Sequence, residues 1–312
     1  MIEKGQSYRL MIEDMSAEGL GIGRIEGMAV FVDGAVVGDV VKAELTKLKK
    51  NYAFGRLTEI LETSPDRVEP FCGYGSACGG CSLQAMSYEG QLRLKEKLVR
   101  DKLVRIGGIE NPTIREIIGM EHPLRYRNKA QFLVGENERG GKGGKPGAPG
   151  VSAVGFYRAK SHQVVDCEEC LIQSEPAEKI AAALRKYMKS DHVSAYDEKT
   201  GKGLIRRLIV KTAFGTGEVM AILVINGKGL PNGEKLVYIM DDAVNELAPN
   251  PETGLEYSLE SVDWNINKKK TSEILGEECV TLAGKPTILE KAGTLQFEIS
   301  PLSFYQVNPV QM

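Results

Sequence analysis

The sequence lacks the features that mark membrane and secreted proteins. No run of its 312 residues approaches the roughly 18 apolar residues that a membrane-spanning helix needs. The N-terminus, MIEKGQSYRL, has no apolar core of a secretory signal. A cytoplasmic protein in a reducing environment is therefore expected. Its six cysteines should then be metal ligands or thiols rather than disulfides.

The sequence also lacks a strong net charge. The formal net charge is −2, which by itself does not point to nucleic acid. Two stretches, residues 42–56 and 93–105, are nonetheless rich in basic residues and could be either solvated faces or RNA-binding surfaces. The basic residues of the first stretch are Lys42, Lys47, Lys49, Lys50 and Arg56.

Short β-branched and aromatic segments fill residues 1–62, with glycines between them. Five such segments predict a small closed barrel of the OB type. The glycines at 19, 21 and 23 resemble a nucleotide-binding loop, but a strand-like segment follows them instead of a helix. We therefore expect them to shape a turn of the barrel.

The remaining chain alternates predicted helices and strands, which indicates an α+β middle domain. A helix is expected over residues 87–106, with Leu92, Val99, Leu103 and Ile106 on its apolar face. Further helices are expected over 178–188 and 234–247, a hairpin over 204–212 and 218–224, and strands over 124–134, 257–265 and 294–299. The low-complexity stretch 139–150 is expected to be a mobile insertion at a hairpin tip, able to pack no core.

Four cysteines suggest a metal centre. Cys72, Cys78 and Cys81 lie within ten residues on a glycine-rich loop, and either Cys167 or Cys170 could supply a fourth thiolate. This donor set suits a [4Fe–4S] cluster or a structural zinc ion, and the spacing leaves both open. Cys279 is expected to be a small buried apolar residue of a strand.

Three cations alternate in LRYRNKAQF. If residues 124–134 form a strand, Arg125, Arg127 and Lys129 share one face. Such a face could contact a phosphate backbone, or it could be an exposed polar sheet face.

Several motifs together resemble the RNA uracil-5-methyltransferase family, in its 23S rRNA type with a TRAM domain. They are CGYGSACGGCSLQ at 72–84, YRNKAQF at 126–132, GFYRAKSHQVVD at 155–166, CLIQ at 170–173 and SPLSFYQVN at 300–308. The resemblance covers essentially the whole chain and implies a [4Fe–4S] cluster rather than zinc. It also implies that Cys170 is the fourth cluster ligand, that Gln306 contacts S-adenosylmethionine, and that Phe304 lies beside the flipped target base.

The resemblance implies a multidomain architecture: an OB-like TRAM barrel, an α+β iron–sulfur and central domain, and only the first segment of a Rossmann-like methyltransferase domain. The expected boundaries are 1–62 for the barrel, 63–110 for linker, cysteine loop and helix, 111–298 for the central domain, and 299–312 for that first segment. In the family the nucleophilic cysteine and general base follow this segment. We therefore expect the chain to be truncated before its catalytic domain and inactive alone.

The expected partner is structured RNA, with 23S rRNA preferred to transfer RNA, and the expected state is a monomer. Two other classes remain open at this point: a non-enzymatic RNA-binding module carrying an iron–sulfur cluster, and a structural protein held by zinc.

Overall fold

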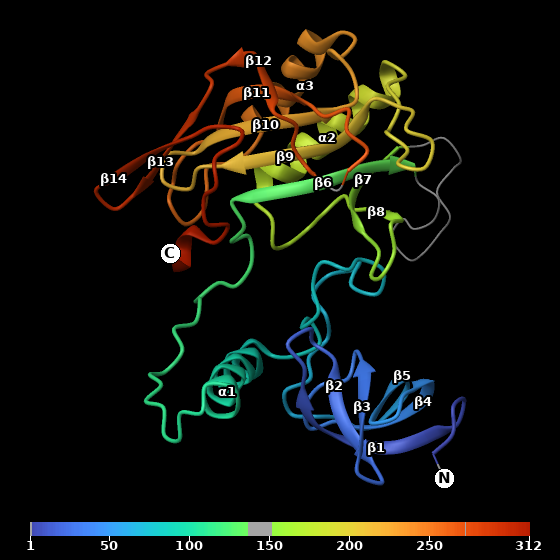
Figure 1. Ribbon diagram of the computed structural model, residues 1–312. Coiled ribbons are helices and arrows are strands. Elements are labelled where there is room, and N and C mark those ends of the chain that lie inside the picture. Colours follow the sequence, from blue (N-terminus) through green and yellow to red (C-terminus); the bar gives the residue numbers. More distant parts are fainter. Residues whose placement is uncertain (1, 137–151, 272) are drawn as a thin grey trace. The chain divides into compact units, whose positions relative to one another are not determined.

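The computed structural model describes residues 2–136, 152–271 and 273–312, which fold as two compact units (Figure 1). Unit 1 comprises Met1–Gly75 and Cys81–Gly119, and unit 2 comprises Ser76–Gly80 and Met120–Met312. The insertion expected over residues 139–150 lies outside the described residues. Within the described part of the chain, no helix is long and apolar enough to cross a membrane.

Unit 1 begins with a closed five-stranded barrel, drawn in blue in Figure 1. The strands pair in the order β1-β2-β3-β5-β4, and all pairs are antiparallel except β3 with β5. The strands are β1 (Ser7–Met15), β2 (Gly21–Ile25), β3 (Met28–Asp33), β4 (Val40–Leu48) and β5 (Tyr52–Glu62). The predicted barrel is confirmed. Of the glycines that resembled a nucleotide loop, Gly19 lies in the turn before β2 with a φ of 86°, whereas Gly21 and Gly23 lie within β2, so the expected turn accounts only for the first.

Alternation along each strand builds the barrel core, because successive side chains of a strand point to opposite faces. The inward side chains include Leu10, Ile12, Val30, Val32, Val41, Ala43, Leu45 and Ala53, all buried. Gly23 lets β1 and β2 approach closely, since a Cβ there would lie 2.5 Å from Leu10 Cδ1. Small inward residues therefore keep the barrel narrow.

A buried ion pair ties the segment after the barrel back to it. The Asp39 side chain is fully buried and accepts from Arg67 Nη2 at 2.6 Å. It also accepts from the backbone N–H groups of Val36 at 2.8 Å and Ser64 at 2.9 Å. Burial is the largest single influence on Asp39 and raises its pKa, but the guanidinium and the backbone donors together outweigh it and hold the pKa below its usual value.

Helix α1 (Tyr88–Arg105) follows the cysteine loop in unit 1. It begins at Ser87, whose hydroxyl caps it by accepting from Gly90 N at 3.1 Å. The helix is confirmed, but its predicted apolar face is wrong. Val99 and Ile106 are exposed, and it is Leu94 that packs against Met15 and Val36 of the barrel side.

Unit 2 is built on a seven-stranded mixed sheet in the order β12-β11-β10-β9-β6-β7-β8. All its pairs are antiparallel except β10 with β11, and α3 makes the crossover between these two parallel strands. The strands are β6 (Lys129–Glu136), β7 (Ser152–Tyr157), β8 (Val164–Asp166), β9 (Ile205–Thr212), β10 (Glu218–Ile225), β11 (Ser258–Ile266) and β12 (Glu278–Gly284).

Two helices, α2 (Glu175–Ser190) and α3 (Gly233–Asn245), cover one face of this sheet and form the main core with it (Figure 1). The other face packs against the hairpin of β13 (Ile288–Ala292) and β14 (Leu295–Ile299). The chain then runs to a short 3₁₀ helix, η2 (Pro309–Gln311). The α+β arrangement, the β9–β10 hairpin and both helices agree with the sequence prediction, although α2 is longer than expected.

One predicted strand is partly wrong. Residues 124–134 were expected to form a single strand, but β6 begins only at Lys129. Arg125 has a φ of 53°, in the left-handed region, which a continuous strand excludes. Arg127 lies before the strand, in an isolated parallel bridge with Gln173. The three cations therefore do not share one strand face.

Candidate RNA-binding surface and cofactor segment

Three aromatic rings gather on the outer face of the barrel. Phe31 of β3 lies opposite Phe54 of β5, and Tyr52 lies two residues before Phe54 on β5. The ring centroids lie 5.6 Å apart for Phe31 and Phe54, 5.7 Å for Tyr52 and Phe54, and 5.9 Å for Phe31 and Tyr52. We call Phe31, Tyr52 and Phe54 the aromatic platform. Unpaired bases stack on such surfaces in single-stranded nucleic-acid binding.

Sequence reasoning missed this platform, although a signal was present. In β5 the inward positions are Ala53 and Gly55, both buried, so Tyr52 and Phe54 must point outward. Large aromatic residues at the outward positions of a strand are unusual unless they have a partner, and this pattern could have been read from the sequence.

Some of the cations predicted from residues 42–56 lie next to this platform. Lys47 pairs with Phe54 across the β4–β5 ladder, and Lys49 N donates to Tyr52 O at 2.9 Å. All four lysines, Lys42, Lys47, Lys49 and Lys50, are exposed and form no ion pair with a described residue. Arg56 differs, because its guanidinium pairs with Glu44 at 2.6 Å and is partly neutralised. The lysines are therefore the cations available to phosphate.

The side chain of Arg125 is engaged in contacts within unit 2. Its guanidinium pairs with Glu178 of α2 and donates to the carbonyls of Cys170 at 3.3 Å and Gln173 at 3.2 Å. Arg127 is half-buried, and its Nε has no hydrogen-bond partner among the described residues. Burial, and then the nearby Arg127, lower the pKa of Lys129. Their role as RNA contacts remains a prediction.

None of the six cysteines forms a disulfide. Cys72, Cys78 and Cys81 lie in a loop without regular structure, and the division between the two units passes through this loop. Cys170 lies in the turn before α2, where its N–H donates to Glu178 Oε1 at 2.6 Å. Among the described residues, no group of three or more Cys, His, Asp or Glu side chains is placed to hold a metal ion.

Two other cysteines are distinct from that set. Cys167 is buried, and Cys279 in β12 is half-buried. Asn265 Nδ2 donates to Cys279 Sγ at 3.1 Å, so this thiol is hydrogen-bonded rather than a purely apolar core residue. Burial raises the pKa of Cys279, which keeps it protonated and a weak nucleophile.

The segment 300–308 is held by residues far away in the sequence. Lys211 Nζ donates to the carbonyls of Ser300 at 2.7 Å, Pro301 at 3.0 Å and Ser303 at 2.9 Å. Asn128, which is buried, donates from its N–H to Val307 O at 3.0 Å and from Nδ2 to Gln306 O at 2.9 Å.

Side chains alternate along this anchored segment. Tyr305 turns inward and packs against Phe297, at 5.6 Å between ring centroids. Phe304 and Gln306 are both exposed, with Phe304 77% accessible. Both side chains are therefore accessible to a ligand. The sequence resemblance requires this of Phe304 for the target base and of Gln306 for the cofactor.

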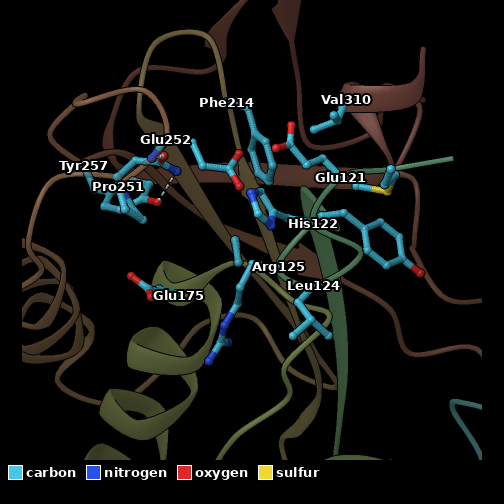
Figure 2. Close-up of a pocket in the computed structure, with 14 residues that line it drawn as sticks. Glu121, His122, Leu124, Arg125, Glu175, Phe214, Pro251, Glu252, Tyr257 and Val310 are labelled. Atoms are coloured by element: carbon cyan, nitrogen blue, oxygen red, sulfur yellow. Dashed lines mark hydrogen bonds between the residues drawn. The ribbon is translucent and has the colours of Figure 1, made fainter. Parts of the chain in front are cut away.

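A cavity of about 510 Å³ lies in unit 2 near this segment, and Val310 lines it (Figure 2). His122 points into it beside Phe214 and Glu121, and Glu175 and Glu252 line it as well. Sequence reasoning singled out none of these residues. Its carboxylates favour a cationic or amino-bearing group, but no described side chain identifies one.

Comparison with known proteins bears first on the barrel. The TRAM domain family matches residues 2–58. Residues 2–58 are a TRAM domain. This match covers the strands β1 to β4, most of β5 and all of the aromatic platform.

Longer relatives match almost the whole chain. A protein of Caldanaerobacter subterraneus named as an uncharacterised RNA methyltransferase is 44% identical over 310 residues, and a similarly named protein of Clostridium tetani is 41% identical. Each match covers 99% of this chain but only 63% and 62% of the relatives. The chain thus has RNA methyltransferase homologues and spans less than two thirds of their length.

A solved structure shares the fold. The crystal structure of Pyrococcus abyssi tRNA (uracil-54, C5)-methyltransferase with S-adenosyl-L-homocysteine matches 97% of this chain and 62% of its own, with a TM-score of 0.67. The sequences are 22% identical. At that identity the likeness establishes the fold and leaves substrate and chemistry to separate argument.

Proposed function

We propose that this chain is the RNA-binding portion of an S-adenosylmethionine-dependent RNA methyltransferase that acts on C5 of uracil. The observation that carries the proposal is the 44% identity across 310 residues to a protein named as an RNA methyltransferase. The uracil-C5 chemistry draws support from the name of the Pyrococcus fold neighbour and from the motif at residues 300–308.

In this proposal the barrel binds RNA by two kinds of contact. Bases stack on the aromatic platform, and phosphates meet Lys42, Lys47, Lys49 and Lys50. Arg56, Arg125, Arg127 and Lys129 complete the predicted set, although the Glu44 and Glu178 ion pairs reduce what Arg56 and Arg125 can offer.

In this proposal the segment at 300–308 contacts both the cofactor and the target base. S-adenosylmethionine supplies an electrophilic methyl group. The exposed Gln306 amide would hydrogen-bond to a polar group of this cofactor. Phe304 would stack on or against a uracil that has left its helix, because a stacked base is inaccessible to an enzyme. Asn128 and Lys211 position this segment through its backbone carbonyls.

We further propose that Cys72, Cys78, Cys81 and Cys170 bind a [4Fe–4S] cluster. Their spacing and the CLIQ match support this assignment, as does the absence of any disulfide among them. The described geometry does not gather them around a metal, so no step of the reaction is assigned to the cluster.

The cluster is tested by metal analysis of protein purified without oxygen. We expect about four irons per chain and broad absorbance near ~400 nm, as four-thiolate clusters give. Cys167→Ser should retain the iron and Cys170→Ser should lose it. Stoichiometric zinc without iron, or iron loss on changing Cys167 alone, would overturn the assignment.

We propose 23S rRNA as the substrate, a monomeric state and a cytoplasmic location. The combination of TRAM barrel and cysteine loop supports ribosomal RNA. Transfer RNA is the second candidate, because the fold neighbour is named as a tRNA methyltransferase. Competition between an rRNA fragment and unmodified tRNA for the purified chain separates the two.

RNA binding is tested by changing Lys47, Lys49 and Lys50 together to Ala. Affinity for structured RNA should fall by about tenfold or more at moderate salt, and the slope of log affinity against log salt should lessen by about two to three, because each neutralised phosphate releases a counterion. The matched control changes Lys179, Lys186 and Lys189, three exposed lysines of α2, to Ala and should leave both quantities unchanged. Equal losses in both triple variants would count against the barrel.

A further inference from the structure

A second surface, in unit 2, combines aromatic rings with guanidinium groups. It surrounds a cavity of about 690 Å³ lined by residues of β6, β7, β8, β9 and the turn at 196–199. We call Tyr157, His162, Tyr196, Arg206 and Arg207 the Arg207 groove. None of these residues belongs to the barrel surface or to the segment at 300–308.

Arg207 lies on β9, the central strand of the seven-stranded sheet. It is half-buried on β9, between Leu133 of β6 and Val224 of β10. Its guanidinium makes no hydrogen bond or ion pair with any residue that the structure describes. Partial burial of an unpaired cation costs free energy, which an anion entering the cavity would recover.

One wall of the groove is a pair of rings. The rings of Tyr157 and His162 lie 5.2 Å apart between centroids, at 38° to each other. Glu198 holds both, because it accepts from Tyr157 Oη at 3.2 Å and lies 3.3 Å from His162 Nδ1. The His162 side chain is 83% exposed, so part of its ring remains open to a planar ligand.

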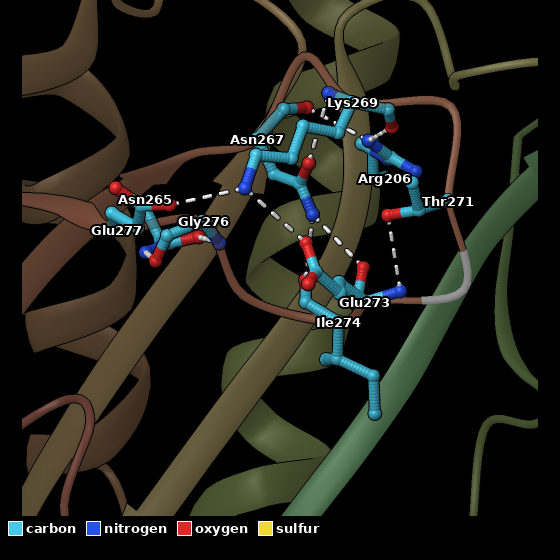
Figure 3. Close-up of polar contacts among 9 residues, drawn as sticks. All are labelled: Arg206, Asn265, Asn267, Lys269, Thr271, Glu273, Ile274, Gly276 and Glu277. Atoms are coloured by element: carbon cyan, nitrogen blue, oxygen red, sulfur yellow. Dashed lines mark hydrogen bonds and ion pairs between the residues drawn. The ribbon is translucent and has the colours of Figure 1, made fainter.

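A second part of the lining is also fixed in place. The Arg206 guanidinium lies 4.5 Å from the centroid of the Tyr196 ring. Arg206 Nη1 donates to the carbonyls of Asn267 and Lys269, each at 2.8 Å (Figure 3). Asn267 is itself held by its donation to Glu273 O at 2.9 Å. This part of the lining is therefore organised before any ligand binds, which lowers the entropy cost of binding.

The acids of the groove do not cancel these cations for a ligand. Glu198 is engaged by Tyr157 and His162, and Asp197 accepts from Thr200 Oγ1 at 2.7 Å and Lys199 N at 2.9 Å. What remains available is the open part of the His162 ring and, on β9, a guanidinium with no partner among the described residues. A planar aromatic ring joined to a phosphate has the matching chemistry.

We propose that the Arg207 groove binds one unpaired nucleotide of an RNA strand, with its base against His162 and Tyr157 and its phosphate on Arg207. The choice of RNA rests on the proposed function. A free nucleotide shares the same chemistry, and the experiment below separates the two sources.

The test uses the full chain and two fluorescent RNAs, a hairpin with a single-stranded tail and the same hairpin without it. Arg207→Met should weaken binding of the tailed RNA by about fivefold to tenfold and lower its salt slope by about one. His162→Ala should weaken it by about threefold without changing the salt slope, because it removes only stacking. Lys186→Met, an exposed charge-matched control on α2, should change neither. Arg207→Lys should restore most of the salt slope.

The outcomes separate this inference from the proposed function. If the lysine triple variant of the barrel loses RNA while Arg207→Met and His162→Ala bind the tailed RNA as the parent does, the groove is not an RNA site and the proposed function stands. If no variant alters binding of either RNA, the proposed function fails as well. Binding of uridine or adenosine monophosphate that depends on Arg207, with no preference for the tailed RNA, overturns the RNA assignment in favour of a free nucleotide.

Discussion

The two units of this protein bury charge in different ways. In unit 1 the buried carboxylate of Asp39 meets the guanidinium of Arg67 at 2.6 Å. In unit 2 the residue Lys211 is 6% exposed, and its ammonium donates to the backbone carbonyls of Ser300, Pro301 and Ser303. Both groups fasten a distant segment to a sheet, one through an ion pair and the other through carbonyl dipoles.

The difference appears in the pKa of each group. Arg67 and two backbone donors hold the pKa of Asp39 below 3.8, so the stability it contributes is present above pH 3.8 and is lost as pH falls. Burial, and then repulsion from Lys129, lower the pKa of Lys211 from 10.5 to about 8. Asp39, which meets a guanidinium, keeps its charged form. Lys211, whose direct contacts are backbone carbonyls, partly gives up its charge, because burial and Lys129 outweigh the attraction of Cys279 and Asp263.

The largest expected effect is the loss of the ion pair. Arg67→Met should lower the unfolding free energy of unit 1 by about 3 kcal/mol, because it leaves the Asp39 carboxylate buried and unpaired. Trp264 is the single tryptophan and lies in unit 2, so its fluorescence follows unit 2 while circular dichroism follows both units. Urea unfolding should show an earlier transition by circular dichroism and little change at Trp264.

A matched control exists on the barrel surface. Arg56 pairs with Glu44 at 2.6 Å, but its side chain is 67% exposed. Arg56→Met should therefore cost less than about 1 kcal/mol. Similar losses in both variants would mean that burial does not distinguish the two pairs, and the comparison between the units would lose its basis.

A smaller effect is expected in unit 2. Lys211→Met should lower the unfolding free energy by about 1–2 kcal/mol, since three carbonyls lose a donor while the cost of burying a cation is relieved. The loss should be concentrated in the segment at 300–308, where hydrogen exchange at the N–H of Ser303 should become faster. Unchanged exchange there would show that Asn128 alone anchors the segment.

The sequence predicted the elements of both units better than their contacts. The barrel follows from alternation within strands, a short-range pattern, and its outward aromatic residues Tyr52 and Phe54 were readable from the same alternation. The predicted face of α1 was wrong because the helix offers two apolar faces, and the barrel residues Met15 and Val36, far away in the sequence, pack against Leu94. No local pattern could have shown these pairings.

The prediction of three cations on one strand face was wrong for a related reason. Arg125 looked like one of three cations on a strand, but its positive φ and its pairing with Glu178, 53 residues later, place it inside unit 2. Lys211 lies in a correctly predicted strand, yet its partners begin 89 residues later. For the cysteines the ligand set stays a prediction from the sequence resemblance, because the described geometry does not gather these side chains around one point.

The smallest expected effect is a dependence of unit 2 stability on alkaline pH. Between pH 8 and 10.5 the unfolded chain holds the Lys211 proton that the folded chain has released, so the unfolding free energy should rise with pH in this window. Cys279 works in the opposite direction, because burial raises the pKa of its thiol and the unfolded chain deprotonates first. The quantity to measure is therefore the difference between the parent and Lys211→Met, followed by Trp264 fluorescence in urea at several pH values. Above pH 8 the unfolding free energy of the parent should rise relative to that of Lys211→Met. Lys129→Met removes the positive charge that repels the Lys211 ammonium, so the rise in unfolding free energy should begin at a higher pH. A rise that begins at the same pH would mean that burial alone lowers the pKa of Lys211.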